Sequence, residues 1–280
     1  MIQDIFPYVF HNEFEIKTPE TDSYFLYFLD GRLLLNKKES AKIPQFEDLK
    51  SLGEEAMSHS DYLFSIDQMD FFLIDETRVA LAETDSLAFY QTGRIRDLEP
   101  MWVSFAAVSA MQLHRFYGSS RFCGCCGSPM MKSKKERSMV CSSCGNTVYP
   151  KISPAVIVAV THNGKLLLTK YAGREYTRYA LIAGYTEFGE TLEETVSREV
   201  MEEVGLRVKN IRYYKNQPWG FSDSILVGYW AELDGSPQVC LDETELSTAE
   251  WMAPEDIPDD FTNLSLTHEM ILLFKNGKVT

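Results

Sequence analysis

Residues 184–206, with the sequence GYTEFGETLEETVSREVMEEVGL, constrain the fold of this chain more than any other stretch. Thr191 and Glu194 have the spacing of a capping box, in which a hydroxyl and a carboxylate satisfy the free N–H groups at the start of a helix. Gly205 suits the left-handed residue that commonly ends one. These signals predict a helix between Thr191 and Gly205.

The predicted helix gathers acidic side chains on one face. Glu199, Glu202 and Glu203 stand at positions i, i+3 and i+4, which are neighbours on a helix surface. A neighbouring apolar stripe, suited to packing against a core, is formed by Val196, Val200 and Val204. Adjacent like charges cost roughly a few tenths of a kcal/mol per pair, and a hard divalent cation held by carboxylate oxygens would offset that cost. The alternative is a solvated acidic face.

Four cysteines predict a second metal site. Cys123 and Cys126 form one C-x2-C pair, Cys141 and Cys144 form another, and fourteen residues separate the pairs. This is the spacing of a four-cysteine zinc ribbon, and unrelated buried or redox-active cysteines are the alternative. Four thiolates close the tetrahedron of a zinc ion and leave no position for water or substrate, so we expect a structural role.

Two further cysteines lie outside this pattern. Cys125 stands within the first pair, as a competing ligand, an oxidisable partner or a bystander thiol. Cys240 falls in an alternation of apolar and polar residues, which predicts a small buried hydrophobe.

Length and charge limit the classes of protein that remain. A chain of 280 residues has room for about two domains. No run of about 18 apolar residues indicates a membrane span, and the start MIQDIFPYVF lacks the basic region of a signal peptide. We therefore expect a cytoplasmic protein with reduced cysteines. A net charge of −14 argues against an extended nucleic-acid-binding surface, although a local basic patch is compatible with it.

The remaining segments alternate strand and helix signals. Residues 1–98 carry aromatic-rich runs with a hairpin signal at Asp30-Gly31, and a helical pattern extends from Pro100 to Gly118. Two apolar strands flank an Asn163-Gly164 turn. A further strand and a closing helix are expected at 224–233 and 267–277. Strands around the acidic helix predict an α+β fold with a layered α/β/α domain.

The stretch 184–206 resembles the Nudix hydrolase family, whose members hydrolyse a nucleoside diphosphate linked to another group with the help of Mg²⁺ or Mn²⁺. It fits the pattern G-x5-E-x7-R-E-U-x-E-E-x-G-U, where U is aliphatic, at every fixed position. Those positions are Gly184, Glu190, Arg198, Glu199, Val200, Glu202, Glu203, Gly205 and Leu206.

The order of segments resembles one branch of that family, the NADH pyrophosphatases, also described as NAD-capped RNA hydrolases. Residues 149–154, YPKISP, are close to the YPRxxP segment that follows the ribbon of that branch. Residues 216–224, NQPWGFSDS, are similar to its SQPWPFPxS motif, which marks NADH preference. The resemblance implies a β-rich α+β domain over 1–118, a zinc ribbon over 119–150 and a Nudix α/β/α sandwich over 151–280. It also implies a homodimer.

The resemblance assigns roles to particular residues. Glu199, Glu202 and Glu203 are the implied catalytic residues. The implied ligands of the catalytic Mg²⁺ or Mn²⁺ are Glu199, Glu203, Glu245 and the backbone oxygen of Ala183, with Glu202 as a further ligand or a base. The implied substrate contacts are Glu136, Tyr149, Gln217, Pro218, Trp219, Gly220, Phe221, Ser222, Asp223 and Ser224. For Glu245 the alternative is an ordinary exposed acid, and Arg198 is better explained as an orienting ion-pair partner of Glu202.

The segment 216–224 departs from the motif it resembles at Asn216, Gly220 and Ser222, where the motif has Ser, Pro and Pro. In an extended segment Trp219 and Phe221 project to one side. Stacking there on a nicotinamide or adenine ring contributes about 1–3 kcal/mol per base, and burial in a core is the alternative. Losing two prolines predicts a more flexible loop and leaves selectivity for the dinucleotide open.

The implied reaction is hydrolysis of NAD(H) to NMN(H) and AMP. NAD-capped RNA presents the same NMN-diphosphate-adenosine head, so we also expect its conversion to NMN and a 5′-monophosphate RNA. Hydrolysis of ADP-ribose or a dinucleoside polyphosphate, and non-catalytic nucleotide sensing, are the alternatives. Candidates for contacts with an RNA backbone, as opposed to a solvated ribbon tip, are Lys132, Lys134, Lys135 and Arg137.

Overall fold

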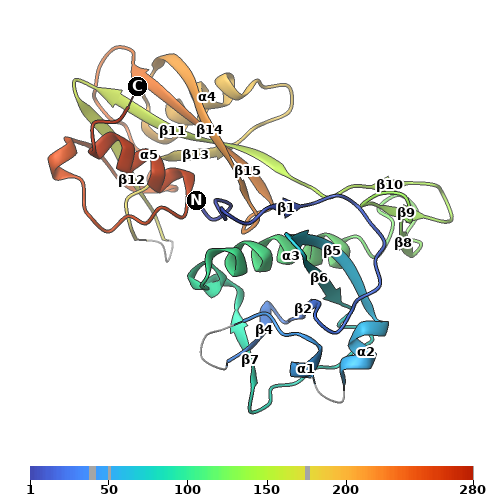
Figure 1. Cartoon of the computed structure of the whole chain (residues 1–280). Helices are drawn as coiled ribbons and strands as arrows, with labels where there is room; N and C mark the ends of the chain where they lie inside the picture. The colour runs from blue at the N-terminus through green and yellow to red at the C-terminus, as the bar shows by residue number, and fades with distance from the viewer. Residues whose placement is uncertain (38–41, 50–51, 174–176, 280) are drawn as a thin grey trace. The chain divides into compact units, whose positions relative to one another are not determined.

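The computed structural model describes residues 1–37, 42–49, 52–173 and 177–279. The chain divides into an N-terminal unit, Ile2–Lys151, and a C-terminal unit, which comprises Met1 and Ile152–Thr280 (Figure 1). Among the described residues, no helix combines the length and apolar character needed to cross a membrane.

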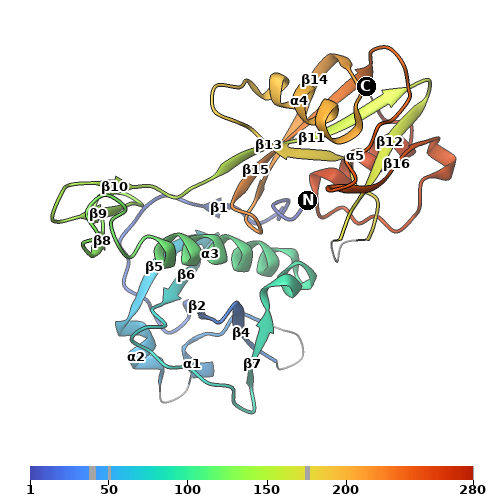
Figure 2. The ribbon, with the colours of Figure 1, turned by 180° about the vertical axis from the view of Figure 1, so that it is seen from behind.

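One mixed sheet forms the centre of the C-terminal unit. Its strands are β11 (Ser153–His162), β12 (Lys165–Tyr171), β13 (Ile182–Tyr185), β14 (Val208–Trp219), β15 (Ser224–Leu233) and β16 (Leu246–Met252). Their order is β14-β15-β11-β12-β16, and β13 pairs with the first half of β11. β11 and β15 run parallel, whereas β12 and β16 pair antiparallel at the edge visible in Figure 2.

The predicted Asn163-Gly164 turn joins β11 to β12. Both residues have positive φ, 47° and 72°, the combination that lets a two-residue hairpin turn follow the twist of its strands. His162 pairs with Lys165 directly across the turn. The hairpin prediction is therefore confirmed.

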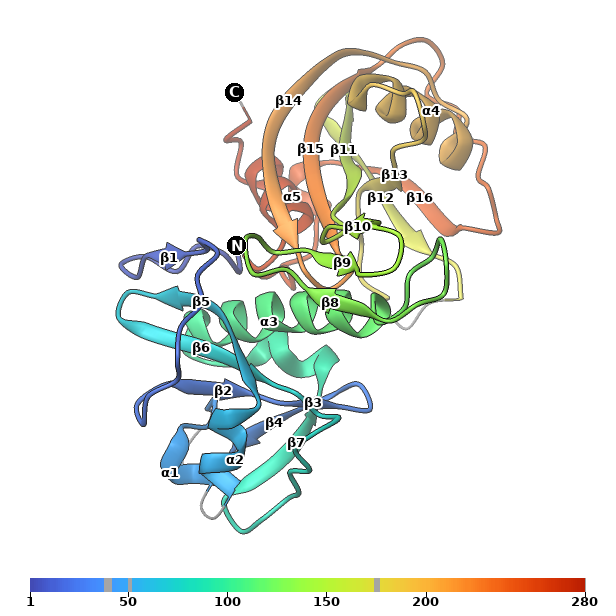
Figure 3. The same ribbon diagram turned by 90° about the vertical axis from the view of Figure 1, so that its right-hand side faces the viewer.

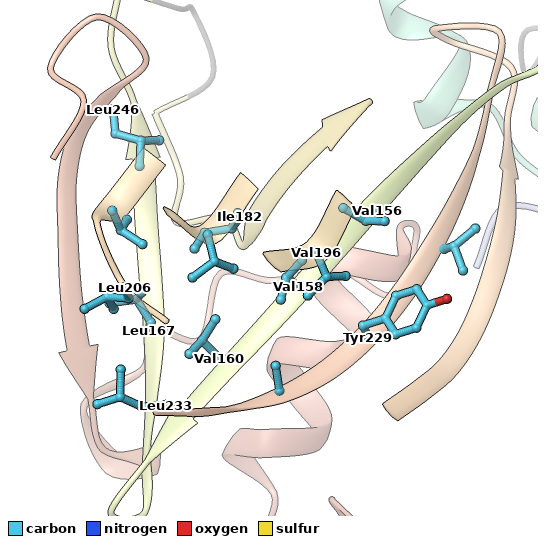
Figure 4. Packing of buried hydrophobic residues seen from close by; sticks show 14 residues of the cluster. Val156, Val158, Val160, Leu167, Ile182, Val196, Leu206, Tyr229, Leu233 and Leu246 are labelled. Atoms are coloured by element: carbon cyan, nitrogen blue, oxygen red, sulfur yellow. The ribbon is translucent and has the colours of Figure 1, made fainter. Parts of the chain in front are cut away.

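Two helices cover the two faces of this sheet. Because side chains alternate along a strand, Val156 and Val158 of β11 pack in the cluster that includes α4 (Leu192–Val204). Ile157 and Ala159 pack in the cluster that includes α5 (Leu266–Lys275). Figure 3 shows α4 and α5 on opposite sides of the curved strands, and Figure 4 shows the first cluster. The predicted α/β/α sandwich is confirmed, as are the strand at 224–233 and the closing helix.

The N-terminal unit contains two small sheets with strand orders β1-β5-β6-β2 and β3-β4-β7. Their strands are β1 (Phe10–His11), β2 (Tyr24–Leu26), β3 (Phe28–Leu29), β4 (Arg32–Asn36), β5 (Ser60–Ile66), β6 (Met69–Ile74) and β7 (Leu87–Gln91). Its helices are α1 (Phe46–Leu49), α2 (Gly53–Ser58) and α3 (Met101–Ser119). Asp30 and Gly31 form the predicted β3–β4 turn, with φ of 50° and 69°.

The predicted end of α3 is wrong by about one residue. Gly118 lies inside the last turn, and the N–H of Ser120 still bonds to the carbonyl of Phe116. The glycine therefore continues the helix instead of adopting the left-handed conformation that would stop it.

A third sheet of the N-terminal unit consists of β8 (Met130–Lys132), β9 (Met139–Cys141) and β10 (Thr147–Val148), in the order β10-β9-β8. We call residues 119–149, which contain it, the ribbon. Phe116 of α3 packs in one cluster with the ribbon residues Met130, Met139 and Cys141. The end of α3 and the ribbon thus share a small apolar core.

Candidate functional site

The helix α4 has the ends that the sequence predicts. The Thr191 hydroxyl accepts a bond from the N–H of Glu194, and the Glu194 carboxylate accepts one from the N–H of Thr191. Both halves of the capping box are present. Gly205 is left-handed, with φ of 67°. The helix start and end are therefore confirmed, and the packing of Val196, Val200 and Val204 in the core sets which face of α4 meets the sheet.

Two of the three glutamates lie on the buried face of α4. Glu199 is 8% exposed and Glu203 is 2% exposed. They alternate with the fully buried stripe of Val196, Val200 and Val204. The side chain of Glu202 is 59% exposed. The three acids therefore face similar directions but differ in environment, because Glu202 lies at the solvent edge of the face.

Arg198 connects the acids of α4. Its guanidinium bonds to both carboxylate oxygens of Glu190, at 2.6 and 3.0 Å, and donates to the backbone oxygen of Tyr185 at 2.9 Å. It also bonds to Glu199 at 2.7 Å and to Glu202 at 2.9 Å. The predicted ion pair with Glu202 is present. This arginine offsets much of the repulsion that the sequence suggested a cation would have to offset.

These contacts change the acidity of the groups in the network. The bonds from Arg198, and then the N–H of Glu187, lower the pKa of Glu190 to about 2. The pKa of Arg198 is raised, first by its bonds to Glu190. Burial raises the pKa of Glu199 despite the bond from Arg198, and the charges of Glu202 and Glu245 add to that rise.

Gly184 on β13 makes room for the carboxylate of Glu199. A β-carbon built at Gly184 would lie 1.9 Å from Cδ of Glu199 and about as close to both carboxylate oxygens. Any side chain at this position would displace the carboxylate. The Nudix pattern of residues 184–206 therefore begins with a glycine because the carboxylate of Glu199 rests directly on the backbone at this position.

The segment after β15 passes beside the end of α4. The N–H of Asp242 bonds to the carbonyl of Glu203 at 2.9 Å, and the N–H of Cys240 bonds to that of Val204. Glu245 is exposed in the turn before β16, and its charge acts on Glu199. The prediction that Cys240 is buried is wrong, because it is exposed. Its backbone pairs with the helix end, so it does not follow the alternation of a strand.

The oxygen-only donor set of these acids fits a hard divalent cation such as Mg²⁺ or Mn²⁺. Ala183 lies on β13 opposite Ile157, directly before the glycine that supports Glu199. Among the described residues, the ribbon cysteines are the single group that brings three or more potential ligand atoms within 4.8 Å of one another. The carboxylates of α4 are therefore close to one another but are not gathered around one point.

The ribbon cysteines fit a zinc ion. Sγ of Cys123 lies 3.6 Å from that of Cys144, and Sγ of Cys126 lies 3.5 Å from that of Cys141. Zinc–sulfur bonds of about 2.3 Å give tetrahedral edges of about 3.8 Å, so the spacing suits one ion. Backbone N–H bonds, first from Cys125, lower the pKa of the Cys123 thiol to about 6.

The two halves of the zinc site have matching turns. Gly127 and Gly145 have φ of 72° and 75°. Their N–H groups bond to the carbonyls of Cys123 and Cys141 at 2.8 and 2.9 Å. Cys125 is exposed and outside the four-cysteine group.

Two of the predicted substrate contacts lie together in the N-terminal unit. The hydroxyl of Tyr149 donates to the carboxylate of Glu136 at 2.9 Å. That bond raises the pKa of the tyrosine. Tyr149 is 55% exposed, so its ring is accessible while its hydroxyl is fixed.

Two of the four basic residues proposed for RNA bind other parts of the N-terminal unit. Lys132 pairs with Asp61 of β5 and lies 4.4 Å from the centre of the Tyr117 ring. Arg137 donates to the backbone oxygens of Leu63 and Asn12 at 2.6 and 3.2 Å. Lys132 and Arg137 thus attach the ribbon to β5. Lys134 and Lys135, the other two candidates for RNA contacts, are exposed.

The segment 216–224 is a strand end followed by a tight turn. Residues 220–223 form the turn between β14 and β15, and Asp223 has φ of 53°. The chain is extended only as far as Trp219, so the condition under which Trp219 and Phe221 would project to one side of a strand is not met. The rings of Trp219 and Phe221 still lie together, with centroids 4.9 Å apart and planes at 54°. Both are half-buried, so they form an accessible aromatic pair.

Other residues of this segment have different surroundings. Gln217 is fully buried, and Ser224 is 1% exposed. Gly220 is buried, Asp223 is half-buried, and Pro218 and Ser222 are exposed. The ten predicted substrate contacts thus range from fully buried to exposed, and their roles stay predictions.

Tyr185 is a site residue that sequence reasoning missed. It is 52% exposed, its hydroxyl lies 3.3 Å from that of Ser224, and its backbone oxygen accepts from Arg198. It therefore connects the acidic network to the β14–β15 turn. Tyr185 occupies a variable position of the Nudix pattern, between Gly184 and Glu190, so the pattern gave no indication of it.

Comparison with known proteins identifies two parts of the chain. The family described as NUDIX domain matches residues 151–270, and the NADH pyrophosphatase zinc ribbon domain matches residues 119–149. The NAD-capped RNA hydrolase NudC of Salmonella typhi is 44% identical over 148 residues, which are 53% of this chain and 57% of that protein. The corresponding protein of Klebsiella pneumoniae subsp. pneumoniae is 44% identical over 149 residues, with the same shares.

The match thus spans a little over half the length of these curated relatives. A solved Nudix hydrolase from Nitrosomonas europaea aligns with a TM-score of 0.49 and 21% identity, and covers 56% of this chain and 91% of that one. On the two family matches alone, residues 119–149 form a zinc ribbon of the NADH pyrophosphatase type and residues 151–270 form a Nudix domain.

Proposed function

We propose that this protein hydrolyses the diphosphate of NAD(H) to NMN(H) and AMP, and converts NAD-capped RNA to NMN and 5′-monophosphate RNA. The family matches and the named activity of the relatives support this proposal. The observation that carries it is the carboxylate of Glu199, which lies directly against Gly184. Both residues belong to a stretch, 184–206, that matches the Nudix pattern at every fixed position. Such a buried acid, paired with Arg198 and next to Glu203, is an arrangement suited to metal-assisted chemistry.

Glu199, Glu203, Glu245 and the backbone oxygen of Ala183 are the proposed ligands of Mg²⁺ or Mn²⁺. The cation, when bound, would neutralise charge on the phosphates and make a bound water more acidic. Arg198 holds Glu199 and Glu202 in place and keeps Glu190 ionised. The exposed carboxylate of Glu202 is the group with room to accept a proton from the attacking water.

The aromatic pair of Trp219 and Phe221 is the proposed contact for a planar base of the substrate. Stacking of a base on such a ring contributes about 1–3 kcal/mol in nucleic-acid systems. Tyr149 and Glu136 are proposed as further substrate contacts. The division at 1–118, 119–150 and 151–280, the homodimer and the cytoplasmic location also belong to this proposal.

A turnover panel tests the function. The purified protein is assayed on NADH, NAD, NAD-capped RNA and ADP-ribose, each with Mg²⁺ and with Mn²⁺. We expect NMN or NMNH as a product of the first three substrates. We also expect the substrate with the highest kcat/KM to be one of these three and not ADP-ribose. Preferential turnover of ADP-ribose would instead assign the protein to another substrate of the Nudix class.

Replacing Glu203 by Gln tests the site. We expect turnover to fall about 10³-fold or more, because several kcal/mol of charge stabilisation are lost with the metal ligand. The matched control is Glu243→Gln, which removes an exposed acid of the same unit. Equal activity of the two variants would remove α4 from the mechanism.

A further inference from the structure

Gln217 is a fully buried amide side chain two residues before Trp219, and both of its polar atoms form hydrogen bonds. It lies on β14 opposite Leu226 of β15 and is 0% exposed. Its Oε1 accepts from the N–H of Leu266 at 2.7 Å, and its Nε2 donates to the carbonyl of Leu264 at 3.1 Å. Burying an amide is costly unless both ends are bonded, so these bonds fix the side chain in one orientation.

The two bonds attach β14 to the first turn of α5. Leu266 is the first residue of α5 and is fully buried. Its side chain packs at Gly228 of β15, where a β-carbon would lie 3.2 Å from Cδ2 of Leu266 and 2.9 Å from Sδ of Met270. The helix start therefore rests closely on the sheet. Gln217 satisfies one of the N–H groups that a helix start leaves without an intrahelical partner.

The turn that follows is closed by hydrogen bonds instead of prolines. The N–H of Ser222 bonds to the carbonyl of Trp219 at 3.3 Å. A proline at position 222 has no N–H and would lack this bond. The hydroxyl of Ser224 donates to the carbonyl of Ser222 at 3.0 Å. Two prolines would restrict the backbone of this turn. Here the restriction comes from the hydrogen bonds inside the turn and from Gln217, which is bonded to α5.

We propose that Gln217 is a positioning residue: its amide anchors the end of β14, just before the 220–223 turn, to α5 and so holds Trp219 and Phe221 ready for a planar base. The inference rests on the proposed function, because it names the part of that site that fixes the aromatic pair. Because Gln217 is fully buried, we assign it an indirect role through the turn in place of the substrate contact that the resemblance implies. Its effect is to lower the entropy that substrate binding would otherwise lose in ordering the turn.

Gln217→Leu removes both bonds while keeping a buried side chain of similar size. We expect KM for the dinucleotide to rise about 10-fold with kcat little changed, because ordering of the turn is then completed only on binding. Amide hydrogen exchange at residues 219–223 and at Leu266 should become faster in the substrate-free protein. A variant that loses thermal stability with unchanged KM and unchanged exchange in the turn would overturn the proposal.

Tyr214→Phe is the matched control. It removes another polar bond between β14 and α5, from the Tyr214 hydroxyl to Glu269 at 2.8 Å, but lies farther from the turn. We expect no change in KM or in amide exchange at residues 219–223. An equal rise in KM for both variants would mean that any loosening of α5 has this effect, and would overturn a specific role for Gln217.

Gln217→Glu gives a second arm that does not depend on the first variant folding. A protonated carboxyl has the shape of the amide and can remake both bonds, whereas the ionised form cannot donate to Leu264. The ratio of its KM to that of the wild type should therefore fall toward one as the pH is lowered. A ratio independent of pH would contradict the proposal. If the wild type turns over none of the dinucleotides, the proposed function fails, and the exchange experiment still decides this inference.

Discussion

The ribbon and α4 hold their candidate metal ligands in opposite ways. The four ribbon sulfurs already lie within 4.8 Å of one another, and two of the cysteines, Cys123 and Cys141, belong to an apolar core. The acids of α4 are held by Arg198 and by close packing on Gly184. Each arrangement follows from its chemistry. Four thiolates can enclose one zinc ion and become part of the fold, whereas the carboxylates of α4 are connected by a cationic side chain, Arg198.

This difference has consequences for stability. Two of the four ribbon cysteines belong to the core at the end of α3, so we expect zinc binding and folding to be coupled. The acids of α4 are already balanced in part by Arg198, so we expect this helix to stay folded without a cation. Stability should therefore respond to one metal and activity to the other.

The largest effect is expected from Cys141→Ser. Structural zinc contributes about 10–16 kcal/mol of apparent binding free energy in small peptides, and Cys141 also belongs to the core with Phe116. We expect metal analysis to show loss of zinc and calorimetry to show loss of the cooperative unfolding of the N-terminal unit. Cys125→Ser, which alters the exposed thiol outside the cluster, should keep both. If Cys141→Ser retained zinc at full occupancy, the proposed difference between a ribbon metal needed for stability and an α4 metal needed for activity would be contradicted.

An intermediate effect is expected from Gly184→Ala. The new methyl group would occupy the space of the Glu199 carboxylate, which is the movable end of a side chain. We expect turnover to fall about 10²-fold or more with little change in thermal stability. Gly118→Ala, in the interior of α3 with open space around it, should keep full activity. A variant of Gly184 that is inactive because it is unfolded would show that this contact belongs to the fold and not to the site.

The smallest effect concerns pH and Glu190. Its folded pKa of about 2 lies below the ordinary 4.5, because Arg198 binds the ionised carboxylate. Its contribution to stability is therefore complete above about pH 4.5 and is lost as the pH falls through about 2. The difference in unfolding free energy between the wild type and Glu190→Gln, measured by urea denaturation, should shrink over that range. A difference that does not vary with pH would exclude this ion pair as its source.

Much of α4 was predictable from local sequence. The capping box at Thr191, the end at Gly205 and the valine stripe all depend on spacing within one helix, and all are confirmed. The separate environments of Glu199 and Glu202 were not predictable, because they depend on β13 lying against only part of the acidic face. The exposure of Cys240 was missed for the same reason: its backbone pairs with the end of α4 instead of with a strand.

The sequence by itself determined the helix with its acids, the four-cysteine spacing and the hairpin turns, since each depends on residues a few positions apart. The tertiary structure alone decided which groups meet over long separations. Gly184 under Glu199, Gln217 on the first turn of α5 and Arg137 on the backbone of Leu63 all join different elements. Such contacts are set by how the elements pack, and no local pattern records them.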